Sequence, residues 1–246
     1  MQSFKSCLLI LFILPQVGFS KNIGMSLGAF VNSSSVLRGA QTWSKPSFMA
    51  GPSFTLFNKV SVRGPSLQYS HFNRESPFEL GAGVSLIDDD EPLLALSGQD
   101  EDYRNQREST WELQLNFKYK FGFFNKFFIG AMVGKDIDET KGLYSELQLG
   151  VPGLLKYTSF EYKISFAESA VNRYYYGPRA ISGRGWQEIS FKYVMLPSAG
   201  IVPWNGVVIN TLAYSKVLQN QNKSADYIRL RDTNLVFSSV FIWNLF

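Results

Sequence analysis

The chain has 246 residues, of which 45% are hydrophobic, 15% aromatic and 18% charged, with a formal net charge of +4. Aromatic residues favour strands and the 20 glycines weaken helix interiors, so this composition argues against a helical bundle. A mean hydropathy of −0.06 is too polar for a protein with several membrane-spanning helices and too apolar for a disordered chain. The small, scattered charge argues against a nucleic-acid partner, which would need clustered Lys and Arg. These values together predict an ordered β protein.

Residues 1–20 have the features of a secretory signal peptide. Lys5 supplies the positive charge, Cys7–Leu14 forms an apolar stretch, and Gly18-Phe19-Ser20 resembles a cleavage region. The apolar stretch is shorter than the roughly 20 residues that span a bilayer as a helix. We therefore expect cleavage after Ser20, with a signal peptide over 1–20 and one exported domain over 21–246.

The exported domain has few residues suited to chemistry. Cys7, the one cysteine, lies in the predicted signal peptide, so we expect no disulfide and no reactive thiol. His71 is the one histidine, so no metal-ligand cluster is expected. We predict no catalytic, cofactor-binding or metal-binding residues.

Alternation of apolar and polar residues repeats along the domain. It is clear at Ile23–Val31, Phe78–Leu86 and Trp111–Tyr119, in runs of about 9 to 11 residues, which is the length of a tilted membrane strand. Further runs lie at Phe127–Val133, Leu143–Val151, Phe160–Phe166, Ile189–Tyr193, Val207–Tyr214 and Leu235–Phe246. Less regular runs lie at Phe48–Phe57 and Val60–Tyr69. No amphipathic helix is expected.

Short and long connections alternate between these runs. Phe121–Asn125 and Pro152-Gly153 are short, whereas Asn32–Lys45, Ile87–Glu108 and Ala167–Gly185 are long and polar. Outer-membrane barrels have short periplasmic turns and long external loops. The pattern therefore predicts an all-β, transmembrane, antiparallel up-and-down barrel in the outer membrane. A soluble β core with aromatic cross-strand pairs is the alternative.

The number of strands depends on parity. Eleven runs are visible, but both chain ends on the periplasmic side require an even number. Twelve strands result if Val60–Tyr69 folds back at Gly64-Pro65, and ten if one weak run is not a strand. We predict twelve, with Phe246 inside the last strand.

Aromatic residues crowd the expected strand ends. They gather around Phe121–Phe128 at one hairpin and at Tyr174-Tyr175-Tyr176 beside a long loop. Aromatic side chains prefer the interface between membrane and water. We therefore expect both groups to lie at that interface.

Six segments occur in a characteristic order along the chain: Phe78-Glu79-Leu80-Gly81-Ala82-Gly83, Asp88-Asp89-Asp90-Glu91, Gly98-Gln99-Asp100-Glu101-Asp102, Tyr119-Lys120-Phe121-Gly122, Asn172-Arg173-Tyr174-Tyr175-Tyr176-Gly177 and Tyr214-Ser215-Lys216-Val217-Leu218. Their order and spacing resemble the MltA-interacting protein (MipA/OmpV) family of outer-membrane proteins. The chain departs from the family at Ser33–Gly39, where a Pro-x-Tyr-x-Gly-Ser element is usual, and in ending Asn244-Leu245-Phe246 instead of Tyr-x-Phe. The resemblance implies a non-enzymatic scaffold or interaction protein with peptidoglycan synthetic or lytic enzymes as possible partners, besides lipid and lipopolysaccharide. We expect a monomer.

Two features could support chemistry. A serine from another strand could form a lipid-hydrolysing site with His71, although the adjacent Ser70 would point to the opposite face of a strand. The acidic residues Asp88–Glu91 and Asp100–Asp102 could collect divalent cations, but they lack the spacing of a calcium loop. We interpret His71 as a residue of a turn or rim, and the acidic segment as a solvated external loop.

The polar positions of the alternating runs predict the lining of the lumen. Charges of both signs are interleaved there and could pair across strands. These positions are Glu112, Gln114, Asn116, Lys118, Glu146, Gln148, Glu161, Lys163, Glu188 and Lys192. A barrel of this size lies between side-chain-filled and water-filled barrels. We expect a narrow or occluded lumen that is structural, with a narrow channel for small solutes as the alternative and a lipid-active enzyme third.

Overall fold

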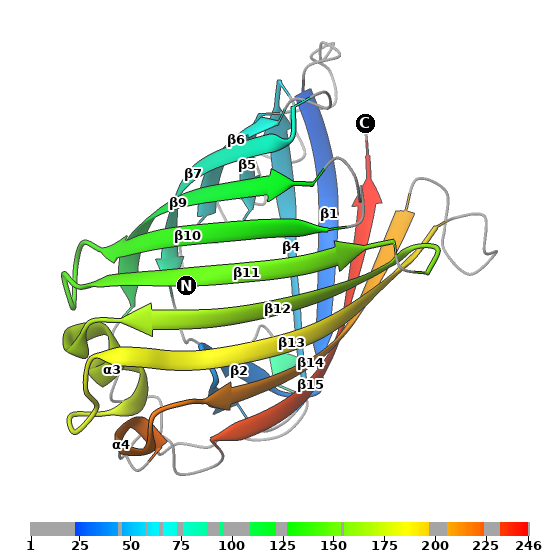
Figure 1. The fold of residues 1–246 in the computed structure, drawn as a ribbon. Coiled ribbons are helices and arrows are strands. Elements are labelled where there is room, and N and C mark those ends of the chain that lie inside the picture. Colours follow the sequence, from blue (N-terminus) through cyan, green and yellow to red (C-terminus); the bar gives the residue numbers. More distant parts are fainter. Residues whose placement is uncertain are drawn as a thin grey trace, which may run out of the picture.

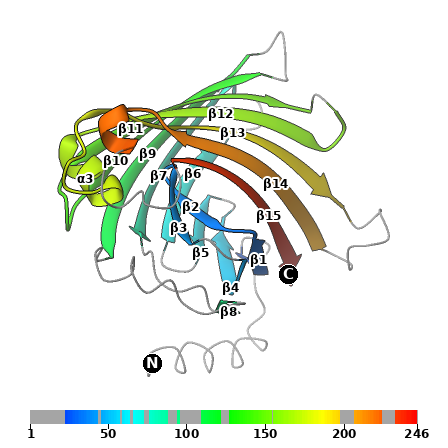
Figure 2. The ribbon, with the colours of Figure 1, turned by 90° about the horizontal axis from the view of Figure 1, so that it is seen from below.

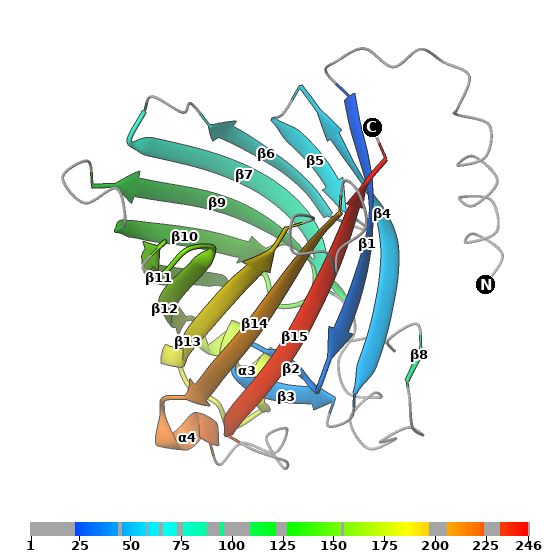
Figure 3. The same ribbon diagram turned by 90° about the vertical axis from the view of Figure 1, so that its right-hand side faces the viewer.

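Twelve strands close into one antiparallel barrel in the computed structural model, which describes residues 23–43, 46–57, 59–63, 66–72, 76–87, 94–95, 109–121, 127–153, 155–196, 206–223 and 232–245. The strands are β1 Ile23–Asn32, β4 Ser47–Leu56, β5 Val60–Arg63, β6 Ser66–Phe72, β7 Phe78–Ile87, β9 Thr110–Lys120, β10 Phe128–Asp136, β11 Leu143–Pro152, β12 Thr158–Ala167, β13 Gly183–Met195, β14 Gly206–Val217 and β15 Thr233–Asn244. β1 pairs with β15 on one side and with β4 on the other, which closes the ring (Figures 1 and 3). The prediction of a twelve-stranded transmembrane barrel is confirmed.

The twelfth strand arises where it was expected. β5 and β6 pair antiparallel on either side of Gly64-Pro65, and β6 then pairs with β7. Gly64 and Pro65 themselves lie outside the described residues.

Strand register places the apolar positions on the outside of the barrel. On β9, Leu113, Leu115 and Phe117 point outward, and the Leu115 side chain is 65% exposed. Backbone polar groups are paired from strand to strand around most of the closed ring, so such a surface can lie in hydrocarbon. Exposed leucines such as these are favourable when the barrel is surrounded by lipid and unfavourable in water. The outer face therefore fits a membrane.

The two ends of the barrel differ in their connections. The turn end carries the short links from β9 to β10 and from β11 to β12, and the loop end carries the links from β1 to β4, from β7 to β9, from β12 to β13 and from β14 to β15. The loop end also has two short links, at 64–65 and 137–142. The prediction that long loops gather at one end is therefore met, but the short links are not all at the other end.

Aromatic rings form a continuous cluster at the turn end. The ring centroids of Phe78 and Tyr119 are 4.8 Å apart, those of Tyr119 and Phe121 4.9 Å, and those of Phe121 and Phe127 5.3 Å. This agrees with the interfacial position expected for Phe121 and Phe127, whereas Phe128 is buried on the inner face and departs from it. Residues 122–126 lie outside the described residues.

The long loops contain structure that the alternation pattern did not predict. The link from β1 to β4 forms a hairpin of β2 Ser35–Leu37 and β3 Ala40–Trp43. In the link from β7 to β9, the two-residue strand β8 Leu94–Ala95 pairs with β4. Helices α3 Ser169–Tyr176 and α4 Asn220–Lys223 lie in the last two loops, so the expectation of no helix was wrong. Figure 2 shows β2 and β3 inside the ring of strands, with α3 and α4 at its rim. Among the described residues, no helix has the length and apolarity to cross a membrane.

The strand ends differ from the prediction at two places. β13 begins at Gly183, six residues before the predicted Ile189, because glycines at 183 and 185 interrupt the alternation and the pairing with β12 is irregular between Ile164 and Phe166. β15 ends at Asn244, and Phe246 lies outside the described residues, as does the predicted signal peptide at 1–20.

Candidate functional site in the barrel lumen

The ten predicted lumen residues all share the inner face. Lys118 faces Gly130 across β9 and β10, Gly130 faces Gln148, and Gln148 faces Lys163, so the register carries one face around the wall. Directly paired residues of antiparallel strands point to the same side of the sheet. The predicted polar lining is therefore confirmed.

Several lumen charges form ion pairs, as expected. Lys163 Nζ lies 3.4 Å from Glu188 Oε1, and Lys192 Nζ lies 2.8 Å from Glu161 Oε2. Lys120 pairs with Glu79 near the turn end. These pairs join neighbouring or near-neighbouring strands, and they stabilise the wall.

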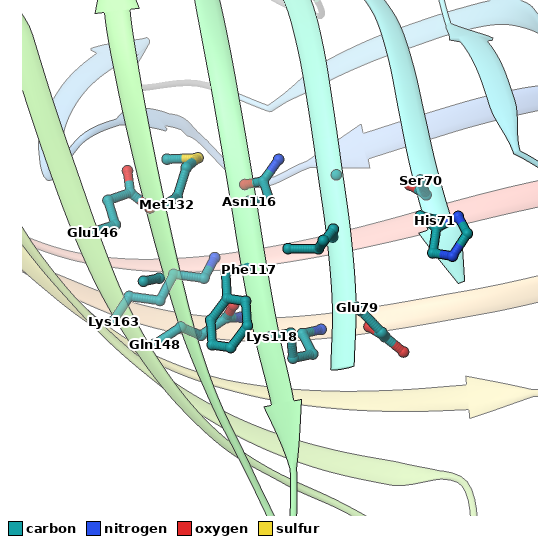
Figure 4. Close-up of a pocket in the computed structure, with 13 residues that line it drawn as sticks. Ser70, His71, Glu79, Asn116, Phe117, Lys118, Met132, Glu146, Gln148 and Lys163 are labelled. Atoms are coloured by element: carbon teal, nitrogen blue, oxygen red, sulfur yellow. The ribbon is translucent and has the colours of Figure 1, made fainter. Parts of the chain in front are cut away.

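A cavity of about 530 Å³ opens on this wall in the half nearer the turn end (Figure 4). Lys118, Asn116 and Glu146 line it, and Lys163 stands beside them. Within the described part of the chain, neither Lys118 nor Glu146 has an ion-pair partner; the Lys118 ammonium lies 4.3 Å from the centroid of the Phe128 ring. Unlike the lumen charges held in the ion pairs above, these two are available to a solute.

At the loop end, the hairpin of β2 and β3 enters the lumen and places Arg38 at its tip. Arg38 Nη2 donates to both carboxylate oxygens of Glu112, at 2.7 and 2.8 Å. The Tyr144 hydroxyl donates to the same carboxylate at 2.8 Å and the Tyr175 hydroxyl at 3.2 Å. The guanidinium carbon of Arg38 lies 3.6 Å from the centroid of the Tyr144 ring, so cation–π contact adds to the ion pair. We call this hairpin, held by Arg38, the plug.

The plug is buried, and its ion pair is hydrogen-bonded through Arg38 Nη2, whereas the buried Nη1 has no hydrogen-bond partner among the described residues. The Glu112 side chain is 1% exposed and that of Arg38 10%. Removing one partner of such a pair leaves a buried charge without compensation. Loss of either partner of this ion pair is therefore expected to destabilise the docked plug.

The backbone of the plug is tight. Arg38 and Gly39 have positive φ values of 51° and 81°. The Tyr176 hydroxyl donates to the Arg38 carbonyl at 2.9 Å, and Asn234 Nδ2 donates to the Gly39 carbonyl at 2.8 Å. These bonds fix the plug to α3 and β15.

The plug leaves the opposite side of the lumen open. Its contacts are with β9, β11, β13, β14, β15 and α3, while Phe30 of β1 and Met49 of β4 remain 42% and 47% exposed on the inner face. A Cβ atom placed on Gly51 would meet no heavy atom within 4 Å. A passage therefore remains along β1 and β4.

Tyr174, Tyr175 and Tyr176 do not form an interfacial belt, which corrects the sequence-based expectation. Tyr175 and Tyr176 are buried, and both contact the plug. α3 turns these side chains toward the lumen, where the buried acceptors lie. Arg38 was missed as a site residue, because a single Arg-Gly pair in a long loop carries no periodic signal.

Alkaline pH is expected to release the plug. Burial raises the pKa of the Tyr175 hydroxyl well above its usual value of 10.0, with the charge of Arg38 opposing the shift. A raised pKa means that the stabilisation by Tyr175 is complete below pH 10 and is lost as pH rises toward the folded-state value. Proteolysis of the hairpin should accelerate between pH 9 and 11 in the parent chain, and the Tyr175→Phe variant should show a smaller change. An equal change in both would contradict this.

His71 lies on the outer face of β6 near the turn end. It pairs with the outward-facing Leu80, and its Nδ1 is 3.5 Å from the hydroxyl of Tyr69. Ser70 pairs with Gly81 and points to the opposite side. This position agrees with the interpretation of His71 as a rim residue. The side chains of Ser70 and His71 lie on opposite faces of β6.

The acidic segments Asp88–Glu91 and Asp100–Asp102 lie outside the described residues. Among the residues that are described, no three His, Cys, Asp or Glu side chains are grouped to hold a metal ion. Asp136, the buried loop-end carboxylate, instead accepts hydrogen bonds from Thr110 at 2.7 Å and Thr140 at 2.9 Å.

The closed ring and its lipid-facing surface define a transmembrane β-barrel. No protein-family model matches this chain, and no curated protein matches it in sequence. Similar solved structures include the KdgM porin, with 9% identity, a TM-score of 0.40 and coverage of 90% of this chain and 98% of that chain. An outer membrane channel from Pseudomonas putida F1 has 8% identity, a TM-score of 0.43 and coverage of 94% and 98%. The outer membrane channel DcaP of Acinetobacter baumannii has 9% identity, a TM-score of 0.37 and coverage of 93% and 99%. Similarity at this level carries no information about what this chain transports or binds.

Proposed function

We propose that this chain is an outer-membrane protein that acts as a narrow channel for small solutes, with the plug as its constriction. The observation that carries the proposal is the cavity of about 530 Å³ on the charged wall. The turn end would face the periplasm and the long loops the exterior, as in outer-membrane barrels generally.

Two features favour a channel over a purely structural lumen. A lumen that serves stability alone gains most when its charges are paired, yet Lys118 and Glu146 are left without ion-pair partners in the described chain. The inner face near Gly51 is also unfilled, whereas small structural barrels fill their interior with side chains.

Conductance tests the proposal directly. The exported domain has no cysteine, so Gly51→Cys provides one labelling site on the inner face. In planar bilayers we expect small single-channel steps, and modification of Gly51→Cys with a negatively charged methanethiosulfonate reagent should reduce them at least twofold. Added bulk and charge beside the open passage are the physical reason.

Ala50→Cys is the matched control, because Ala50 is the neighbour of Gly51 on the outer face. Exposure of this variant to the same reagent should leave the steps unchanged, because a charged reagent does not enter the lipid that the outer face contacts. Absence of any steps in the parent chain, or equal reduction in both variants, would contradict a channel along β1 and β4.

The scaffold role that the family resemblance implies is a separate hypothesis. It rests on the order of segments such as Phe78–Gly83 and Asn172–Gly177, and a contact surface for peptidoglycan enzymes has no support in the described residues. Crosslinking in intact envelopes, followed by identification of the bound proteins, distinguishes a scaffold from a channel. The proposed outer-membrane location requires export, for which we propose residues 1–20 as the signal peptide.

A further inference from the structure

One register row of the inner wall is wholly apolar. Across the strands, Val194 faces Ile209, Ile209 faces Val240, Val240 faces Phe30, and Phe30 faces Met49. We call these five residues the apolar row. Barrel interiors are usually polar, so a continuous apolar row on the inner face needs an explanation.

The apolar row connects the two ends of the barrel. Val194 and Ile209 lie near the turn end of β13 and β14, whereas Phe30 and Met49 lie near the loop end of β1 and β4. This follows from the tilt of the strands, because a row that crosses tilted strands climbs along the barrel axis. The row therefore runs along the passage that the plug leaves open.

The opposite wall carries the charges. Glu79, Lys118, Gln148, Lys163 and Glu188 belong to another register row, with Gly130 between Lys118 and Gln148. The lumen is thus amphipathic in cross-section, with aliphatic side chains facing interleaved charges.

The apolar row ends beside an unpaired strand edge. β5 pairs only with Ser53–Leu56 of β4, and β8 pairs with Ser47 and Phe48. Among the described residues, Met49–Pro52 consequently have no strand on the side away from β1, and Pro52 fits such an edge because proline is confined to sheet edges and bulges. The outward-facing residues here are Phe48, Ala50 and Pro52, so the row lies next to the apolar outer surface of the barrel.

We propose that the lumen binds an amphiphile with a single aliphatic chain, whose chain lies on the apolar row and whose charged head faces the opposite wall. Four of the five row residues are aliphatic, which suits an alkyl chain better than a sugar ring, since sugars are bound by stacking on aromatic faces. Phe30 and Met49, at the loop end of the row, are exposed and available to such a chain. This inference rests on the proposed passage, and it names the class of solute that the passage takes.

Photolabelling of the full barrel in phosphatidylcholine vesicles tests the proposal, with a decanoate that carries a diazirine at its alkyl end as the probe. Residue-level mass spectrometry should find labelling of Phe30 and Met49 that saturates and is competed by excess decanoate or decyltrimethylammonium, but not by maltose. Val31 and Phe48 are internal controls, because they neighbour these residues on the outer face. Their labelling should rise linearly, as expected for probe dissolved in lipid.

A variant extends the test. Ile209→Ser with Val240→Ser should raise the half-saturating probe concentration about tenfold, since buried apolar area is lost. The double variant Val208→Ser with Phe241→Ser changes the outer face of the same strands and should leave the half-saturating probe concentration unchanged. Folding of each variant is checked by heat-modifiable migration on gels.

Non-saturable labelling of Phe30 and Met49, or competition by maltose equal to that by decanoate, would overturn the proposal. Conductance measured on the same preparations distinguishes failure of the amphiphile proposal from failure of the channel proposal. Conductance steps without saturable labelling would support the channel and contradict the amphiphile site. Saturable labelling without conductance steps would support the amphiphile site and contradict the channel.

Discussion

Replacing Arg38 by methionine is expected to release the plug and enlarge the channel. Methionine keeps much of the volume but leaves the Glu112 carboxylate, 1% exposed, without its cation. Breaking a buried pair in this way costs about 3 kcal/mol or more, which shifts the docked hairpin toward the released one by roughly a hundredfold. Single-channel conductance in planar bilayers should rise severalfold, and the hairpin should become sensitive to added protease.

Two further variants show whether charge is the cause. Arg63→Met removes an exposed arginine on the inner face of β5 that has no ion pair among the described residues, and it should leave conductance near that of the parent. Arg38→Met combined with Glu112→Gln removes both charges and should restore part of the docking, because the amide keeps an acceptor oxygen for one of the hydroxyls of Tyr144 and Tyr175 and donates from its NH2 group to the other. Unchanged conductance in Arg38→Met would show that the plug is not the constriction.

Gly39→Ala is expected to expel the plug by steric means. A Cβ atom at Gly39 would lie 2.7 Å from Trp186 Cβ and 3.4 Å from Val217 Cγ2. Gly39 also has a φ of 81°, which costs a residue with a side chain about 1–2 kcal/mol. The clash with Trp186 adds to this, because a Cβ atom on the β13 backbone cannot rotate away. Conductance and protease sensitivity should change as in Arg38→Met, although every charge is kept.

Gly153→Ala is the matched control for backbone strain. Gly153 has a φ of 70°, but a Cβ there would meet no heavy atom within 4 Å, and the residue lies at the turn end. It should lower the stability of the barrel slightly without changing conductance. Equal conductance changes in Gly39→Ala and Gly153→Ala would contradict a specific effect on the plug.

Much of the barrel could be predicted from the sequence because its signals are local. Alternation within Trp111–Tyr119 assigns each side chain to one face whatever strand lies beside it. The even strand number follows from Gly64-Pro65 and from the need to bring both ends of the ring to one side. The charge of the lumen, including Lys118 and Glu146, follows from the same alternation.

The plug could not be predicted, because it depends on contacts between distant parts of the chain. Arg38 and Glu112 are separated by 74 residues, and Asn234 bonds to the Gly39 carbonyl across 195. Loops lack periodicity, so the sequence does not indicate whether Arg38 points outward or into the barrel. Tyr174–Tyr176 were misplaced for the same reason, since aromatic residues suit both a membrane interface and a buried cluster.

The sequence by itself determined which residues face lipid and which face the lumen, since strand parity requires no knowledge of the neighbours. Only the tertiary structure decided which lumen residues lie together. The apolar row joins Val194 to Met49 across five strands, and strand register, which is set by pairing around the closed ring, brings them into line. The same ring closure places Arg38 against Glu112 and leaves the side of β1 and β4 open.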